Sequence, residues 1–199
     1  KKPDRPMQRG TIEKRADVVV IGAGGAGLAA TVSAHQNGAS VLVLEKMPMV
    51  GGNTIISGAA FNAVDPERQS KQGIEDSVEK HFTQTYEGGD KVGKPELIRT
   101  LVENAYSALK WLENMGMKFK DEVFTVLGGL WPRAHQPVEP LGTGYINTYM
   151  NYINQHSDDI EIMLNTRATE LIVENGRVIG VEAESPEGKV IAKANNGVI

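Results

Sequence analysis

The sequence contains no cysteine, which excludes several kinds of site at the outset. A chain without thiols has no disulfide bond, thiolate-bound zinc, iron–sulfur cluster or c-type haem of its own. It also contains no P-loop, HExxH or G-x-S-x-G motif. The formal net charge is only −4 at pH 7, so the basic surface typical of proteins that bind nucleic acid or anionic membranes is missing. The cellular compartment stays open, because cytosolic and exported proteins can both lack cysteine.

The composition is otherwise that of an ordinary globular protein, since 40% of the 199 residues are hydrophobic and 23% are charged. This length suffices for one domain with a real core, or slightly more. Residues 1–15 are polar and contain prolines, so we expect a linker or flexible lead-in there. Residues 196–199 (NGVI) begin like a strand with no polar tail after them, and we expect the chain to be the N-terminal part of a longer protein.

Residues 16–45 predict a β-α-β unit with a nucleotide site at its first turn. An apolar run at 18–21 leads directly into 22–27 (GAGGAG), which matches G-x-G-x-x-G; a small-residue helix, a second apolar run at 41–44 and Glu45 follow in register. This order favours dinucleotide binding, with NAD and FAD both open, over a ligand-free glycine turn. A signal peptide or membrane helix fits less well, because glycines and a second strand interrupt the apolar stretch.

Each residue type in this unit has a physical role. Gly22 allows a tight turn, Gly24 lets the backbone approach a pyrophosphate because it has no Cβ, and Gly27 permits close packing of the helix on the sheet. The helix N-terminus offers N–H groups and a positive dipole end to phosphates. Glu45 would accept hydrogen bonds from an adenosine ribose, and its charge would repel a 2′-phosphate.

A second glycine pair follows the acid at once, in Gly51-Gly52-Asn53-Thr54. Such a loop can offer backbone N–H groups to a diphosphate and a side-chain amide to a ribityl chain or flavin ring. The alternative is a plain turn in which Asn53 or Thr54 caps a helix. The position of the loop directly after Glu45 and Lys46 favours the cofactor interpretation.

The rest of the chain mixes helices and strands. We expect a short buried helix or turn over 55–61, a polar surface segment from Asp65, helices over 74–86, 95–115 and 145–156, and an irregular stretch over 118–144. We expect strands over 160–164, 170–174, 178–184 and 189–194, with an Asn-Gly hairpin turn at 175–176. This β-meander predicts an antiparallel layer beside a parallel sheet.

Four stretches carry a resemblance to a known family: 18–30 (VVVIGAGGAGLAA), 45–54 (EKMPMVGGNT), 131–137 (WPRAHQP) and 165–181 (NTRATELIVENGRVIGV). Together they resemble the FAD-dependent flavoproteins that include soluble fumarate reductases, flavocytochrome c and urocanate reductase. The resemblance implies a Rossmann-like α/β fold of the glutathione-reductase type, with a parallel sheet plus an antiparallel β-meander. It also implies that residues 16–199 are the N-terminal part of a truncated FAD-binding domain, without the cap domain that binds substrate.

The resemblance implies an FAD site that is spread along the chain. It places Gly22, Ala23, Gly24, Gly25, Ala26 and Gly27 against the pyrophosphate, Glu45 and Lys46 at the adenosine ribose, Gly51, Gly52, Asn53, Thr54, Ser57 and Gly58 at the ribityl and flavin end, and the Ala168 backbone at the adenine. Covalent-flavin relatives such as succinate dehydrogenase carry a flavin-linking histidine where this chain has Asn53, so FAD is expected to be non-covalent. The family often has Gly-Gly where this chain has Ala59-Ala60, which leaves contacts there open.

The chemistry implied for the full-length protein is hydride transfer from reduced flavin to the C=C bond of an unsaturated carboxylate, fumarate-like or urocanate-like. The family's substrate-binding and proton-donating residues lie downstream, so we assign no catalytic residue and no metal ligand here and expect this fragment alone to be inactive. The electron donor stays open, and neither nucleic acid nor a membrane span is expected. Alternatives are another superfamily member, such as a ketosteroid dehydrogenase or aspartate oxidase, or a non-catalytic nucleotide-binding module.

The four histidines and Arg133 are the remaining candidates for a chemical role. Arg133 and His135, in the expected loop, could shuttle protons or bind a carboxylate, but a pair that fixes the loop is favoured. His35, His81 and His156 fall on expected helices without a metal-like partner, so all three are expected at the surface.

Overall fold

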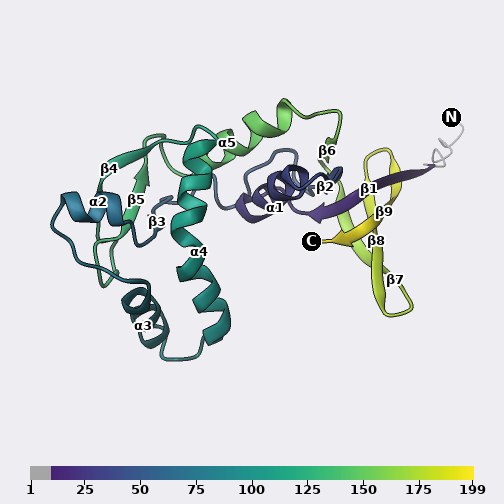
Figure 1. Ribbon diagram of the computed structural model, residues 1–199. Coiled ribbons are helices and arrows are strands. Elements are labelled where there is room, and N and C mark those ends of the chain that lie inside the picture. The colour runs from purple at the N-terminus through teal and green to yellow at the C-terminus, as the bar shows by residue number, and fades with distance from the viewer. Residues whose placement is uncertain (1–9) are drawn as a thin grey trace, which may run out of the picture. The chain divides into compact units, whose positions relative to one another are not determined.

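The computed structural model describes residues 10–199, which form two compact units (Figure 1). The first unit combines the residues up to Ile55 with Tyr149–Ile199, and the second unit is Ile56–Thr148. Residues 1–9 of the expected lead-in lie outside the described residues. In the described part of the chain, no helix has the length and apolar character needed to cross a membrane.

The first unit is built on one six-stranded sheet with the order β6-β2-β1-β9-β8-β7. Its strands are β1 (Thr11–Ile21), β2 (Val41–Leu44), β6 (Ile160–Met163), β7 (Arg167–Glu174), β8 (Arg177–Ser185) and β9 (Gly188–Val198). β6, β2, β1 and β9 pair in parallel, whereas β7, β8 and β9 form an antiparallel meander. The expected mixture of parallel strands and meander is confirmed. The expectation of a separate layer is wrong, because β9 pairs with β1 and continues the same sheet.

The expected lead-in is also wrong in its last part. Thr11–Arg15 are strand residues, and they pair in parallel with Lys189–Lys193 of β9. Half-buried positions alternate with exposed ones there, and Lys14 Nζ reaches Glu161 at 2.8 Å. The segment looked like a linker because its exposed face is charged, while its pairing partner lies far away in the sequence.

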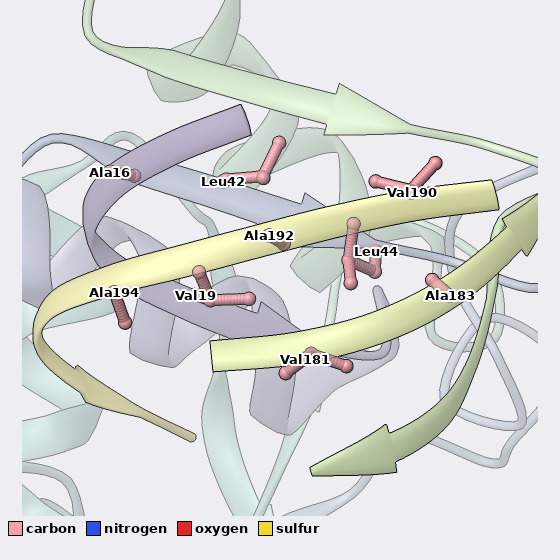
Figure 2. Close-up of a cluster of buried hydrophobic side chains, with 9 residues drawn as sticks. All are labelled: Ala16, Val19, Leu42, Leu44, Val181, Ala183, Val190, Ala192 and Ala194. Carbon is pink, nitrogen blue, oxygen red and sulfur yellow. The ribbon is translucent and has the colours of Figure 1, made fainter. Parts of the chain in front are cut away.

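A cluster of buried side chains joins the parallel strands to the meander (Figure 2). Val19 of β1 and Leu44 of β2 are 0% and 1% exposed, and Val181 of β8 is 0% exposed. The other members are mostly alanines and small aliphatic residues: Ala16, Leu42, Ala183, Val190, Ala192 and Ala194. Full burial of one valine or leucine side chain contributes about 1.5–3 kcal/mol, so this cluster holds the meander to the nucleotide-binding strands.

Helix α1 (Gly25–Gln36) begins directly at the glycine turn and packs through Leu28, Thr31 and Val32. Gly22 has φ +101°, a left-handed conformation that favours glycine. A Cβ atom on Gly27 would collide with the carbonyl oxygen of Gly22. The close packing expected of Gly27 is therefore confirmed, and the group it approaches is the backbone of the turn itself.

The second unit contains three whole helices, α2 (Pro66–Lys71), α3 (Val78–Gly88) and α4 (Pro95–Asn114), together with the start of α5 (Thr143–Asn154). Its small sheet has the order β3-β5-β4, from β3 (Phe61–Asn62), β5 (Ala134–Pro137) and β4 (Phe119–Phe124). Helices α3 and α4 lie side by side (Figure 1), joined by Arg99, which donates to Glu79 at 2.6 Å. As expected, α4 starts at Pro95 and buries one stripe: Val102, Ala105, Leu109 and Leu112.

Several local expectations for this unit are wrong. Residues 118–144 contain β4 and β5 instead of an irregular stretch. β4 was not predicted because a register shift between Phe119 and Val123 breaks the alternation of buried and exposed side chains. Of the helix and the turn expected for 55–61, the turn is observed, but it is not buried, since Ile56 is 70% exposed. Asp65 is fully buried as the N-cap of α2 instead of starting a surface segment. Helix α3 begins only at Val78, after its N-cap Ser77.

Replacing Gly27 by alanine should lower the free energy of unfolding by about 1–3 kcal/mol, because the added methyl group must displace the Gly22 carbonyl. Chemical denaturation of the variant measures the loss. Gly197→Ala is the matched control, since a Cβ atom there meets nothing within 4 Å, and it should change stability by less than about 0.5 kcal/mol. Equal stabilities of the two variants would contradict the packing argument.

Candidate functional site

The glycine turn leaves the start of helix α1 open to an anion. Gly24 is the N-cap residue and offers no side-chain cap, and the first turn of the helix contains no acidic residue. Within the described part of the chain, the backbone N–H groups of Ala26 and Gly27 donate to no protein acceptor. Unpaired N–H groups at the positive end of a helix are a suitable cradle for a phosphate.

Glu45 lies at the end of β2 with only 6% of its surface exposed. Its Oε2 accepts a hydrogen bond from the N–H of Ala23 at 2.7 Å, and its Oε1 accepts one from the N–H of Met47 at 2.8 Å. The carboxylate therefore joins the glycine turn to the loop after β2. Each carboxylate oxygen has a further lone pair for a hydroxyl donor. Sequence reasoning expected the acid at this edge but missed its bond to the turn.

The structure brings the second glycine pair directly against the first. The N–H of Gly51 donates to the carbonyl of Ala23 at 2.8 Å, and Gly51 forms a parallel bridge with Gly24. Gly51 and Gly52 have φ values of +120° and +51°, and a Cβ on Gly52 would lie 3.2 Å from the Cα of Gly24. Two segments that looked separate in the sequence thus form one surface, and the left-handed conformations of Gly51 and Gly52 favour glycine in the second segment.

The start of β7 lies next to Glu45. The N–H of Thr166 donates to the Glu45 carbonyl at 2.8 Å, and the N–H of Asn165 donates to the Met47 carbonyl at 3.0 Å. Two residues further on, Ala168 is partly buried and pairs with Ala183 of β8. Because β7 is the edge strand of the sheet, alternate backbone groups along it have no strand partner on that side.

The remaining expected site residues are exposed or belong to the other unit. Lys46 and Asn53 are exposed on the loops of the first unit. Ser57 and Gly58 belong to the second unit, where the side chain of Gln136 donates to the Gly58 carbonyl at 3.4 Å.

These groups have the chemistry required by the ADP half of a dinucleotide. The open helix start and the glycines without Cβ atoms suit a diphosphate, while the buried carboxylate of Glu45 suits hydroxyl donors and disfavours a phosphate. Residues 17–199 match the family described as the FAD binding domain. The chain belongs to this FAD-binding family. FAD is therefore the cofactor to which the site corresponds.

Two similar proteins are oxidoreductases by name. The chain is 38% identical over 189 residues to an NADH:fumarate oxidoreductase of Klebsiella pneumoniae, covering 94% of this chain and 20% of that protein. It is 38% identical over 174 residues to a urocanate reductase of Eggerthella lenta, covering 84% of this chain and 28% of that protein. The chain thus spans only 20–28% of the length of these relatives.

Solved structures show the same fold. A flavocytochrome c3 fumarate reductase in an open conformation superposes with a TM-score of 0.87 at 29% identity, covering 94% of this chain and 33% of that one. A 3-ketosteroid-Δ4-(5α)-dehydrogenase from Rhodococcus jostii superposes with a TM-score of 0.79 at 26% identity, covering 94% of this chain and 45% of that one. The expected Rossmann-like FAD-binding fold is confirmed.

Arg133 and His135 lie in the core of the second unit rather than at a loop surface, with 5% and 0% exposure. Arg133 forms a bidentate pair with Asp76, at 2.8 Å from Nε and 2.7 Å from a terminal nitrogen. The His135 ring contacts Asp65 Oδ2 at 3.0 Å through Nε2 and the Phe61 carbonyl at 3.0 Å through Nδ1. The geometry supports the interpretation that this pair fixes the local structure.

The two aspartates in these pairs are ionised in the fold. Burial opposes ionisation of Asp65, but hydrogen bonds from Arg68, His135 and Glu67 more than offset it, so its pKa lies below the usual value. Burial likewise opposes ionisation of Asp76, and bonds from Arg133 and Gln69 hold its pKa below the usual value. These carboxylates stabilise the second unit above their unfolded pKa, and that contribution is lost in stronger acid.

The expectation that His81 lies at the surface is wrong. The residue is only 6% exposed, and its Nδ1 has no hydrogen-bond partner within the described residues. Burial, together with the charge of Arg133, lowers the pKa of His81 to about 4, while Asp76 acts in the opposite direction. The other two histidines are half-buried, with His35 Nδ1 at 2.8 Å from the Tyr152 hydroxyl. No group of three or more potential ligands that could hold a metal is found among residues 10–199.

His81 should make the protein acid-sensitive well above pH 4. The unfolded chain binds a proton at an ordinary histidine pKa of about 6.5, whereas the folded chain does so only near pH 4, so stability falls as pH decreases between these values. The loss should reach up to about 3 kcal/mol. Denaturation curves measured from pH 7 to 4.5 should show this slope, and His81→Leu should remove it. Parallel pH profiles of the two proteins would contradict the assignment.

Proposed function

We propose that this chain is the FAD-binding part of a flavoprotein that reduces the C=C bond of an unsaturated carboxylate. The observation that carries the proposal is the glycine turn held by Glu45 and faced by Gly51 and Gly52. The names of the relatives supply the substrate class, since they are fumarate, acrylate and urocanate reductases.

The proposed roles follow the geometry of the first unit. The turn residues Gly22–Gly27 hold the diphosphate through the open helix start, and Glu45 accepts hydrogen bonds from the adenosine ribose with Lys46 beside it. The backbone of Ala168 meets the adenine. Gly51, Gly52, Asn53, Ser57 and Gly58 belong to the ribityl and flavin end. When bound, FAD supplies hydride transfer to an activated double bond.

We further propose that the flavin is held without a covalent bond. Asn53 stands at the position of the flavin-linking histidine of covalent relatives, and an amide lacks the ring nitrogen that forms such a bond. No residue of the chain is proposed to bind or protonate substrate. Arg133 and His135, the most plausible candidates by residue type, are buried and paired to Asp76 and Asp65. Substrate binding is assigned to the part of the protein that this chain does not cover, so the chain alone should be inactive.

A second candidate is a steroid dehydrogenase. The superposition on the 3-ketosteroid-Δ4-(5α)-dehydrogenase supports it, although at lower identity than the match to the carboxylate reductases. Both candidate activities would use the same cofactor site, so only an assay with each substrate can distinguish them.

The test uses the purified full-length protein. It should be yellow, acid precipitation should release all of its FAD into the supernatant, and the protein should oxidise a reduced artificial donor in the presence of fumarate, acrylate or urocanate.

A 3-ketosteroid with an oxidised artificial acceptor in place of the reduced donor is the matched assay, because a dehydrogenase takes electrons from the steroid, and it should give no turnover. Turnover only with the steroid would replace the first candidate by the second. A colourless protein that stays colourless after FAD is added would overturn the cofactor assignment. Flavin that remains in the precipitate would overturn the non-covalent attachment.

A further inference from the structure

Helix α1 needs a cap that its own N-cap residue cannot give. Helices usually begin at a serine, threonine, aspartate or asparagine whose side chain accepts one of the first N–H groups. Gly24 occupies this position and has no side chain with which to accept such a bond. The cap must therefore come from elsewhere in the chain.

Thr54 supplies it from the second glycine loop. Its Oγ1 accepts a hydrogen bond from the N–H of Gly25, the first residue of the helix, at 3.1 Å. A Cβ atom on Gly25 would lie 2.6 Å from the same hydroxyl oxygen. The Thr54 hydroxyl can therefore reach the Gly25 N–H only because Gly25 has no side chain.

The loop that carries Thr54 is anchored at its base. The N–H of Gly51 donates to the Ala23 carbonyl at 2.8 Å, and the N–H of Ile55 closes the loop on the Gly51 carbonyl at 3.2 Å. Thr54 therefore approaches the helix from a fixed direction. With the Gly25 N–H occupied, the next two N–H groups of the helix, those of Ala26 and Gly27, have no acceptor among the described residues.

We propose that Thr54 is a positioning residue for the diphosphate end of the cofactor site rather than a contact of the flavin. Its hydroxyl fixes the start of α1 so that the N–H groups of Ala26 and Gly27 point at the diphosphate. The proposal rests on FAD as the cofactor and is independent of the substrate, so a failure of carboxylate reduction leaves it untouched.

ADP distinguishes this role from a flavin contact, because ADP contains the diphosphate and adenosine but no flavin. Titration calorimetry on the full-length apoprotein measures both affinities. Thr54→Val keeps the side-chain shape and removes the acceptor, and it should weaken ADP and FAD by the same factor, about 5- to 10-fold. Thr54→Ser restores the hydroxyl and should return both affinities to within about twofold of the original.

Thr31→Val is the matched control on the same helix. Among the described residues the Thr31 hydroxyl bonds only the Gly27 carbonyl of its own helix, at 2.8 Å, so its loss should leave both affinities within about twofold. Hydrogen exchange gives a second readout, since the Gly25 amide should exchange faster in Thr54→Val alone. A loss of FAD affinity with unchanged ADP affinity would assign Thr54 to the flavin and overturn the proposal. Unchanged affinity for both ligands would overturn it as well.

Discussion

The buried carboxylate of Glu45 is the interaction on which the first unit depends. A charge with 6% exposure is costly unless it is well hydrogen-bonded, and here two backbone N–H groups, those of Ala23 and Met47, satisfy it. One bond reaches the turn after β1 and the other the loop after β2. The backbone of Glu45 itself joins β6 and the start of β7 through Met163 and Thr166. Four segments of the chain therefore meet at one residue.

This arrangement explains why the cofactor site needs so few side chains. The turn is built from glycines because its backbone must approach both the second glycine loop and a diphosphate. Its shape is then held by groups outside the turn, chiefly Glu45 and Thr54. A turn held by the protein's own hydrogen bonds needs little ordering when a ligand binds. In the second unit, by contrast, the buried carboxylates of Asp65 and Asp76 pair with Arg68 and Arg133.

The sequence predicted the parts of the fold whose signals are local. The G-x-G-x-x-G turn lies between a strand and a helix as expected, and the Asn175-Gly176 turn has φ values of +51° and +77°, as the hairpin signal requires. What it could not predict depends on distant partners. Thr11–Arg15 are strand residues because β9 pairs with them, and the buried Asp65 contacts His135, which lies 70 positions away. The Thr54 bond to Gly25 joins residues 29 positions apart, with no pattern between them to reveal it.

Glu45→Gln in the full-length apoprotein tests the central claim most directly. The amide has only one acceptor oxygen, so either Ala23 or Met47 loses its partner. If Glu45 forms the site before FAD binds, the apoprotein should lose about 1–3 kcal/mol in its free energy of unfolding, and FAD affinity should fall as well. An apoprotein of unchanged stability, with only the affinity reduced, would mean that Glu45 serves the ribose alone and would contradict the claim.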